Sequence, residues 1–534
     1  MSVDIRVTGR AATAVSAVLP GLVSDLTASG VAAADPALWP DSPDGDGRMR
    51  LGWLEAVTRS RPLVERIGPL REVLLADGVT RIVLAGIGGA ALAAEVIAAT
   101  NGLPLVVLDS TAPSQVLSAV DGDSESGGLA QTALVVASPA GSAETTAFLR
   151  VFETAYRDIG MDPATRIVVV TDPGSPLESE ATRAGYTLFP SDPSASGSYA
   201  ALTAPSLIPA GLAGADIGEI LDEAEAALLD AAIDDHRNPA LVLAAALTGG
   251  LPHADKVGLI ADGTHLVGFE VWLEYLVAQS TGRPAGGILP VVLLPVSPEA
   301  TAAPEDLQLV RFVADVDDGR LFEPHHGEVL VSGSLGAQFL VWQTALAIAA
   351  QTLGTNPFDR PEPTPAHTEW PPASLPAAPM FTSQEVEVRV SDPDLAVSET
   401  VAGVFDALWS RLEPGGYCAI AAFADRGRRA PLEGLRDLVA AASGRPTTFA
   451  WGPRYLPAVG RLHTTARPPG VFVVILDADE VDLEIPGAAR TFAGMLHDEA
   501  AAQVDELIRN GRPVVVLTLT DGDQDLTELF ESVH

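Results

Sequence analysis

A glycine-rich turn is the feature of this chain whose residue types most clearly suit ligand binding. The apolar run Ile82 to Ala85 is followed by Gly86, Gly88 and Gly89, and an Ala-rich segment then begins. A strand, a tight turn and a helix N-terminus in this order place backbone N–H groups where an anion or a hydroxylated ligand can bind. The turn is not the G-x-G-x-x-G pattern of dinucleotide-binding proteins, so we expect no nucleotide cofactor.

Residues that could act as nucleophiles, as general bases or as metal ligands form few recognisable groups in this sequence. The nine histidines are scattered, and no Ser-His-Asp set can be argued from them. His325 and His326 lie beside Glu323 and Glu328 but lack distant ligands, so we predict no metal site and no cofactor. The single cysteine, Cys418, excludes an intrachain disulfide and fits a cytoplasmic location.

Charge and hydropathy exclude two classes of partner. The net charge of −38 would repel nucleic acid, and no apolar run approaches the 18 or so residues of a membrane span. The acidic surface is either ordinary solvated surface or a dock for a basic partner protein.

Strands and helices must position the glycine turn, and they alternate along the chain. This alternation predicts an α/β fold with doubly wound parallel sheets. The strands that we expect lie at 82–85, 105–108, 133–137 and 167–171, then at 257–261, 291–295, 309–313 and 329–331, and finally at 386–390, 418–423, 471–476 and 514–517.

Composition also suggests where the domains end. We predict a helical N-terminal segment at 1–60, a first α/β domain at 61–235 and a second at 236–355. A Pro-rich segment at 356–381 reads as a linker, and a C-terminal α/β domain occupies 382–534.

Several motifs recur in one known order. They include AGIGGAALAAEV (85–96), VVASPAGSAETTAFLRVF (135–152), WLEYLVAQSTGRPAGGILPV (272–291) and GTNPFDRP (354–361). Together they resemble the tandem sugar isomerase (SIS) domains of the glucose-6-phosphate isomerase family, and most closely the isomerase half of bacterial transaldolase–glucose-6-phosphate isomerase fusions. The resemblance implies two SIS-type domains, followed here by a C-terminal α/β unit.

The resemblance also implies a chemistry. The family interconverts an aldose phosphate and a ketose phosphate, which requires a carboxylate to move a proton and a cation to stabilise the enediolate. Gly88 and Gly89 match the family's sugar-binding turn, although Ala90 replaces its serine. The hydroxyls that match the phosphate loop are those of Ser138, Ser142, Thr145 and Thr146, with Pro139 where a lysine is common. The alternative is that these hydroxyls only cap the following helix.

Two positions that carry the family's reaction are substituted. Ser198 stands where the family has the arginine that stabilises the enediolate. Gln279 stands where it has the proton-transferring glutamate, and an amide cannot act as a base near neutral pH.

Four further residues match or neighbour family positions. His367 falls where the family has a lysine, and His463 remains in a run whose first histidine is Pro457. We take Gln279, His367 and His463 as candidate catalytic residues. Arg283 and Arg454 are candidates for binding the anionic substrate, together with Ser198 and the loop hydroxyls.

The expected function is therefore a glucose-6-phosphate isomerase-like protein that binds a phosphorylated hexose with impaired or absent isomerisation. The alternatives are an active glucose-6-phosphate/fructose-6-phosphate isomerase, or a non-catalytic regulatory partner of pentose-phosphate enzymes. The resemblance also implies a homodimer.

Overall fold

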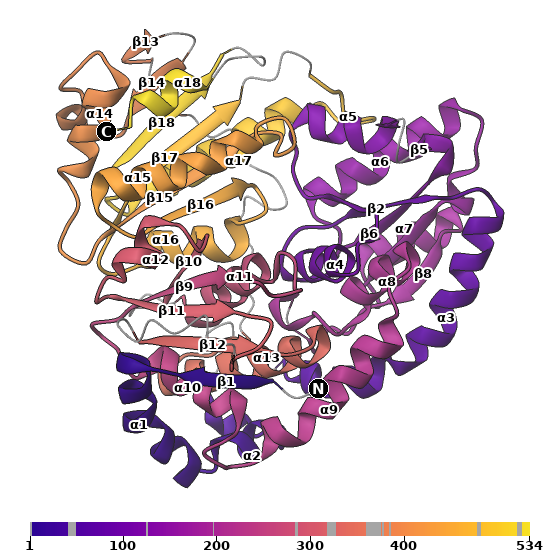
Figure 1. Ribbon diagram of the computed structural model, residues 1–534. Helices are drawn as coiled ribbons and strands as arrows, with labels where there is room; N and C mark the ends of the chain where they lie inside the picture. Colours follow the sequence, from indigo (N-terminus) through magenta and orange to yellow (C-terminus); the bar gives the residue numbers. More distant parts are fainter. Residues whose placement is uncertain are drawn as a thin grey trace.

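Three large β-sheets flanked by helices build the protein (Figure 1). The computed structural model describes residues 3–40, 50–123, 127–195, 197–282, 287–317, 327–358, 375, 379–383, 386–477, 482–520 and 526–533. In Figure 1 the first sheet lies at the right in purple, the second at the lower left in dark blue and salmon, and the third above it in orange and yellow. The α/β fold class is confirmed.

The first sheet is parallel throughout. Across the sheet its strands are β3 (Leu105–Leu108), β2 (Arg81–Ala85), β6 (Thr132–Ala137), β7 (Ile167–Thr171) and β8 (Thr187–Pro190). Its helices are α3 (Ala56–Ala76), α4 (Gly89–Thr100), α5 (Pro113–Asp121), α6 (Ala143–Asp158), α7 (Pro176–Ala184) and α8 (Ala204–Ala213), and a small hairpin pairs β4 (Gly122–Asp123) with β5 (Gly127–Gly128). Within β2, Ile82 and Leu84 face the apolar cluster of α4 and α8, whereas Val83 and Ala85 face that of α5, α6 and α7. Helices on both faces explain why the strands are continuous apolar runs.

The second sheet contains one antiparallel strand at its edge. Across the sheet its strands are β1 (Asp4–Val7), β12 (Glu328–Ser332), β11 (Leu307–Phe312), β9 (Lys256–Ala261) and β10 (Leu289–Leu293). Its helices are α1 (Gly9–Ser24), α2 (Thr27–Ala32), α9 (Ile217–Ala232), α10 (Pro239–Thr248), α11 (Phe269–Thr281), α12 (Pro298–Ala302) and α13 (Leu335–Thr352). Within residues 1–60, for which the sequence predicts a helical segment, Asp4–Val7 forms strand β1, which pairs with the otherwise open edge of β12.

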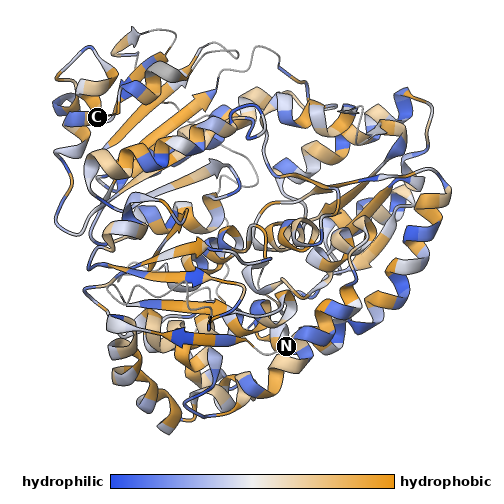
Figure 2. Ribbon diagram, viewed as in Figure 1, coloured by the Kyte–Doolittle hydropathy of each residue, from blue (hydrophilic) through white to orange (hydrophobic). Residues whose placement is uncertain are grey.

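The third sheet is mixed. Across it lie β13 (Phe381–Ser383), β14 (Val386–Val390), β18 (Val514–Leu519), β17 (Gly470–Asp477), β15 (Tyr417–Phe423) and β16 (Thr447–Gly452), with β13 and β14 antiparallel to their neighbours. Its helices are α14 (Val401–Trp409), α15 (Leu435–Ser443), α16 (Arg461–Thr465), α17 (Phe492–Arg509) and α18 (Thr527–Glu531). Figure 2 shows the strands of this sheet in orange, as expected for a buried layer.

The three sheets meet around α11. This helix contacts α4 of the first sheet and the turn at Leu456–Gly460 of the third, and β10 contacts β16. Residues of all three parts of the chain can therefore line a common cavity.

Candidate active site

The glycine turn approaches its neighbours so closely that side chains are excluded. Gly88 has φ of +105°, in the region that favours glycine, and a Cβ there would lie 3.0 Å from the Tyr275 hydroxyl. A Cβ on Gly89 would lie 2.9 Å from the Cα of Ser198. The turn, α11 and the 3-10 turn at Gly197–Tyr199 thus form one wall.

A cavity of about 220 Å³ opens beside this turn, and we call it the site cavity. Five of the predicted residues line it: Gly88, Gly89, Ser138, Ser198 and Gln279. The chain positions of these residues span almost 200 residues, so the fold brings together what the sequence could only group by resemblance. Whether they bind a ligand stays a prediction.

Gln279 has the side chain best placed to meet a ligand. It is 9% exposed, and it lines the cavity from the last turn of α11. Within the described part of the chain its carboxamide has no hydrogen-bond partner. The adjacent Ser280 hydroxyl lies 2.8 Å from the Tyr199 hydroxyl, which fastens α11 to the Gly197–Tyr199 turn. Gln279 can therefore donate to or accept from a hydroxyl in the cavity.

The hydroxyls at the start of α6 form a capping box. The Ser142 hydroxyl accepts from the Thr145 N–H at 3.2 Å, and the Thr145 hydroxyl accepts from the Ser142 N–H at 2.9 Å. Ser138 accepts from the Gly141 N–H at 3.1 Å. The capping interpretation of Ser142 and Thr145 is therefore confirmed, and any phosphate role would come in addition to it.

The same hydroxyls border a smaller cavity of about 160 Å³ next to the site cavity. Ser138 lines both cavities, and Ser142 and Thr145 line the smaller one. Thr146 lies on the first turn of α6 but lines neither. Because α6 begins here, its partial positive charge faces this space.

The described lining of these two cavities carries acids and no basic side chain. The acids are Asp172 and Asp192 in the site cavity and Glu144 in the smaller one. A phosphate would therefore depend on hydroxyls, backbone N–H groups and the dipole of α6.

His463 lies in the core and not in either cavity. It is 3% exposed, and its Nδ1 lies 3.0 Å from the Tyr417 hydroxyl. Burial lowers its pKa to about 3, with the nearby Arg512 contributing to the decrease. We correct the catalytic interpretation of His463, because a neutral histidine enclosed by Tyr417, Tyr455 and Phe472 has no access to a ligand in the site cavity.

The remaining predicted residues lie elsewhere. The prediction that Arg454 binds the anionic substrate is also corrected. Arg454 does not line the site cavity, and it pairs with Glu95 at 2.9 Å and with Asp109 at 3.2 Å. Arg283 and His367 lie outside the described residues, as do His325 and His326. In the part of the chain that the structure describes, no group of three His, Cys, Asp or Glu side chains could hold a metal. No helix there is long and apolar enough to cross a bilayer.

Several lining residues were not predicted, among them Asp172, Asp192 and Tyr275. Tyr275 precedes Gln279 by four residues on α11, so both face the site cavity. Burial raises the pKa of the Tyr275 hydroxyl, and the Gly89 backbone hydrogen-bonds to it. The spacing of four residues was the signal that could have found it.

Comparisons with known proteins identify the relationship. No protein family model matches the chain. A protein named "Probable glucose-6-phosphate isomerase" from Haloarcula marismortui is 31% identical over 271 residues, which are 50% of this chain and 58% of that protein. A "Glucose-6-phosphate isomerase" from Synechococcus sp. is 32% identical over 228 residues, which are 38% of this chain and 40% of that protein. Part of the chain is thus similar in sequence to glucose-6-phosphate isomerases.

The match to these glucose-6-phosphate isomerases is partial. This chain covers little more than half the length of the Haloarcula protein and two fifths of the Synechococcus protein. A hypothetical protein from Thermus thermophilus has a TM-score of 0.55 at 22% identity, over 67% of this chain and 97% of that one. A glucose-6-phosphate isomerase from Chlamydia trachomatis has a TM-score of 0.53 at 16% identity, and the match covers 64% of this chain and 82% of that one. At these identities the two structures establish the fold alone.

Proposed function

We propose that the chain binds a phosphorylated hexose in the site cavity and isomerises it slowly or not at all. One observation carries the proposal. The Gln279 carboxamide, 9% exposed and unpaired within the described chain, lines the cavity together with the glycine turn. It is at this position that the resemblance puts a proton-transferring glutamate.

The placement of the sugar follows from the groups available. The Gln279 amide can donate to and accept from sugar hydroxyls, whereas a carboxylate could only accept. The phosphate would lie at the start of α6, near Ser138 and Ser142, where the helix dipole favours negative charge. Gly88 and Gly89 leave room for the sugar because they carry no side chains, and Ile87 is the one side chain that this turn adds to the lining.

The expected loss of rate has two chemical causes. An amide cannot remove the proton that must move between C1 and C2, and losing a general base costs about 10²–10⁴-fold. Ser198, 4% exposed in the cavity wall, has no positive charge to stabilise an enediolate oxygen.

Binding and turnover are tested separately. Thermal unfolding of the full chain with fructose 6-phosphate or glucose 6-phosphate should show a rise in Tm, since a ligand of the native state stabilises it. Unphosphorylated fructose and glucose should shift the Tm less, because they lack the group held at α6. A coupled assay should show turnover well below about 1 per second.

Two results would overturn the proposal. Equal shifts with phosphorylated and unphosphorylated sugars, or none with either, would contradict phosphate binding. Turnover at ordinary enzyme rates would show that Gln279 does not limit the chemistry.

A further inference from the structure

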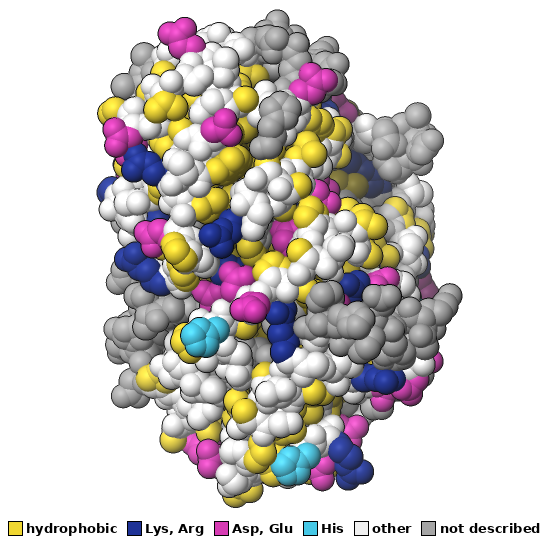
Figure 3. Space-filling model, turned by 60° about the vertical axis from the view of Figure 1, so that its left-hand side comes forward, with side chains coloured by type: hydrophobic (Ala, Val, Ile, Leu, Met, Phe, Trp, Pro, Cys, Tyr) yellow, Lys and Arg dark blue, Asp and Glu magenta, His cyan; other side chains and the backbone are white. Residues whose placement is uncertain are grey.

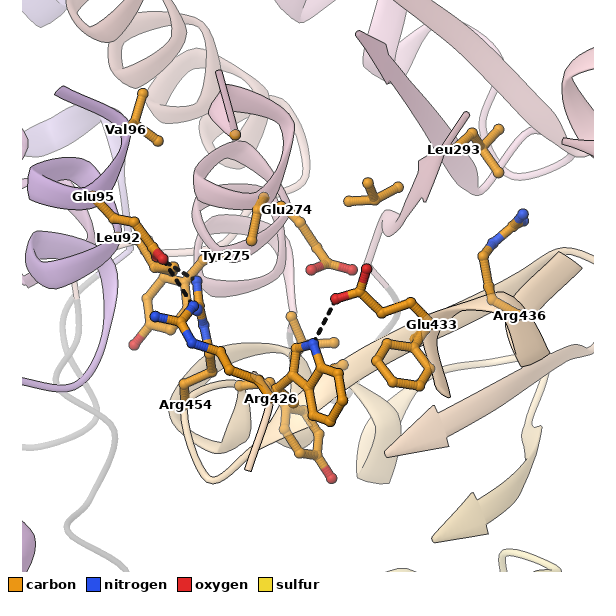
Figure 4. A pocket seen from close by; sticks show the side chains of 18 of the residues that line it. Leu92, Glu95, Val96, Glu274, Tyr275, Leu293, Arg426, Glu433, Arg436 and Arg454 are labelled. Atoms are coloured by element: carbon orange, nitrogen blue, oxygen red, sulfur yellow. Dashed lines mark hydrogen bonds and ion pairs between the residues drawn. The ribbon is translucent and has the colours of Figure 1, made fainter. Parts of the chain in front are cut away.

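A second and larger cavity lies where the three sheets meet. Its volume is about 500 Å³, within the range of small-molecule sites. Figure 4 shows its walls, which come from α4, α11, β10 and the segment from Arg426 to Val459. It shares only Tyr275 with the described lining of the site cavity. We call it the junction cavity.

Most charges around the junction cavity are already neutralised. Arg426 and Arg454 both bind Glu95, at 2.8 and 2.9 Å, and Arg454 also pairs with Asp109 (Figure 4). Arg436 is bound by Glu299 and Asp437. These arginines therefore offer little attraction to an anionic ligand.

Two carboxyl groups of the described lining form no ion pair. Glu274 is 7% exposed, its Oε1 is enclosed without a hydrogen bond, and in Figure 4 its carboxyl points into the cavity. Glu433 faces the same space and accepts from the Trp451 indole N–H at 2.7 Å. An unpaired buried carboxyl costs free energy, so a partner that reaches it would bind strongly.

The rest of the lining is apolar and aromatic. Phe449 and Trp451 form an edge-to-face pair with ring centroids 5.1 Å apart. At the cavity, Val267 is 53% exposed and Leu294 is 61% exposed, which leaves uncovered apolar surface there. Figure 3 shows acidic and basic side chains close together among apolar ones near the middle of one face of the molecule.

We propose that the junction cavity binds an apolar organic cation, whose charged nitrogen pairs with Glu274 and whose apolar body packs against Phe449 and Trp451. An aromatic face adjacent to a carboxylate suits an ammonium group, because both attract positive charge. An anion would meet two carboxyl groups and arginines that are already paired, and a neutral molecule could only hydrogen-bond to Glu274.

The proposal predicts a proton exchange. Burial raises the pKa of Glu274 to about 8, with Glu270 adding to the rise and Arg454 opposing it. The empty cavity at pH 7 therefore holds a largely protonated Glu274, whereas a bound cation favours the carboxylate. Binding should release close to one proton per ligand at pH 6–7, and fewer as the pH rises above about 8.

The test compares two molecules that share one ring system. Tryptamine carries an ammonium group, and tryptophol is its neutral alcohol counterpart. In calorimetric titrations of the full chain, tryptamine should bind about tenfold or more tightly than tryptophol, as expected for a charge-assisted contact. Repeating the titration in buffers of different ionisation enthalpy measures the proton release.

Two variants locate the effect. Glu274→Gln keeps the size of the side chain and should reduce the preference for tryptamine to less than about threefold. Glu270→Gln is the matched control: Glu270 lies one turn earlier on α11, is half-buried with a pKa that burial raises, and does not line the cavity. Because Glu270 adds to the raised pKa of Glu274, this variant should at least keep the preference for tryptamine while releasing fewer protons on binding.

Each outcome is decisive. Equal affinity for tryptophol, no proton release, or a preference that survives in Glu274→Gln would overturn the proposal. Failure of both molecules to bind would also overturn it, without bearing on hexose phosphate binding in the site cavity.

Discussion

Single side chains decide what the site cavity can do. Gln279 has the burial and the position expected of a catalytic group, but an amide can only hold a hydroxyl and not remove a proton. Ser198 lines the same wall without a charge. Both were identified from the sequence by resemblance, and the fold brings them together. The sequence could not show that Arg454 and His463 lie outside the site cavity. A local motif does not reveal that Arg454 pairs with Glu95, or that His463 is enclosed by aromatic rings.

Restoring a carboxylate should restore some chemistry. We expect Gln279→Glu to raise isomerisation of fructose 6-phosphate by about tenfold or more, since burial would also raise the pKa of the new carboxyl toward that of a useful base. The coupled assay measures it. Gln351→Glu, at the half-buried end of α13 and outside the cavities, controls for a contaminating isomerase. Equal rates in the two variants would contradict the role of position 279.

The glycine turn gives a second test at the residue scale. Gly88→Ala should destabilise the protein by about 1–3 kcal/mol and abolish the sugar-phosphate shift, because the methyl group meets a positive φ and the Tyr275 hydroxyl. Gly78→Ala has a φ of +84° but open space around it, so it measures strain alone. Thermal unfolding with and without fructose 6-phosphate checks both. If fructose 6-phosphate raised the Tm of Gly88→Ala as much as that of the unaltered protein, the glycine turn would not be part of the binding site.

His463 should behave as a buried neutral base. Its native pKa of about 3 lies below the ordinary value of 6.5, so below pH 6.5 the unfolded chain binds a proton that the native state refuses. Relative to His463→Gln, the free energy of unfolding of the unaltered protein should fall by about 1.4 kcal/mol per pH unit as the pH decreases from 6.5 toward 3. Chemical denaturation across this range measures it. A ring that titrates near pH 6.5 by NMR in the folded protein would contradict the burial.

At the scale of elements, apolar runs were sufficient to predict most of the fold. Strands β2, β3, β6 and β7 lie where the sequence predicts them. The sequence did not predict several strands, among them β1, β8, β13 and β16. Strands β1 and β8 are each four residues long with mixed polarity, and their pairing with β12 and β7 comes from tertiary context. Helix α6 is the element most relevant to function, since its capping box lies beside the site cavity and its smaller neighbour.

The start of α6 can be tested against a matched helix. Ser142→Ala and Ser175→Ala each remove an N-cap hydroxyl, from α6 and α7 respectively, and each should cost about 1 kcal/mol of stability. Ser142 lines the smaller cavity and Ser175 does not, so only Ser142→Ala should also weaken the Tm shift caused by fructose 6-phosphate. Equal shifts in the two variants would show that phosphate does not bind at α6.

At the scale of the whole molecule, the two cavities differ in which of the three sheets contribute to their walls. The site cavity is framed by the first two sheets, and the junction cavity requires all three. The sequence predicted the sheets but neither cavity, because cavities form between segments hundreds of residues apart. The net charge of −38 opposes any dianionic ligand, so local donors at α6 must compensate for it.

The central claim is binding with little or no turnover, and one NMR measurement tests it directly. Fructose 6-phosphate labelled with ¹³C at C2 is mixed with an equimolar amount of the full chain, and its spectrum is followed with time. We predict that the sugar signals broaden on binding and that any glucose 6-phosphate signal grows far more slowly than the few seconds that an isomerase of ordinary rate would need at equimolar concentration. Rapid conversion to glucose 6-phosphate, or unbroadened sugar signals at millimolar protein, would contradict the account.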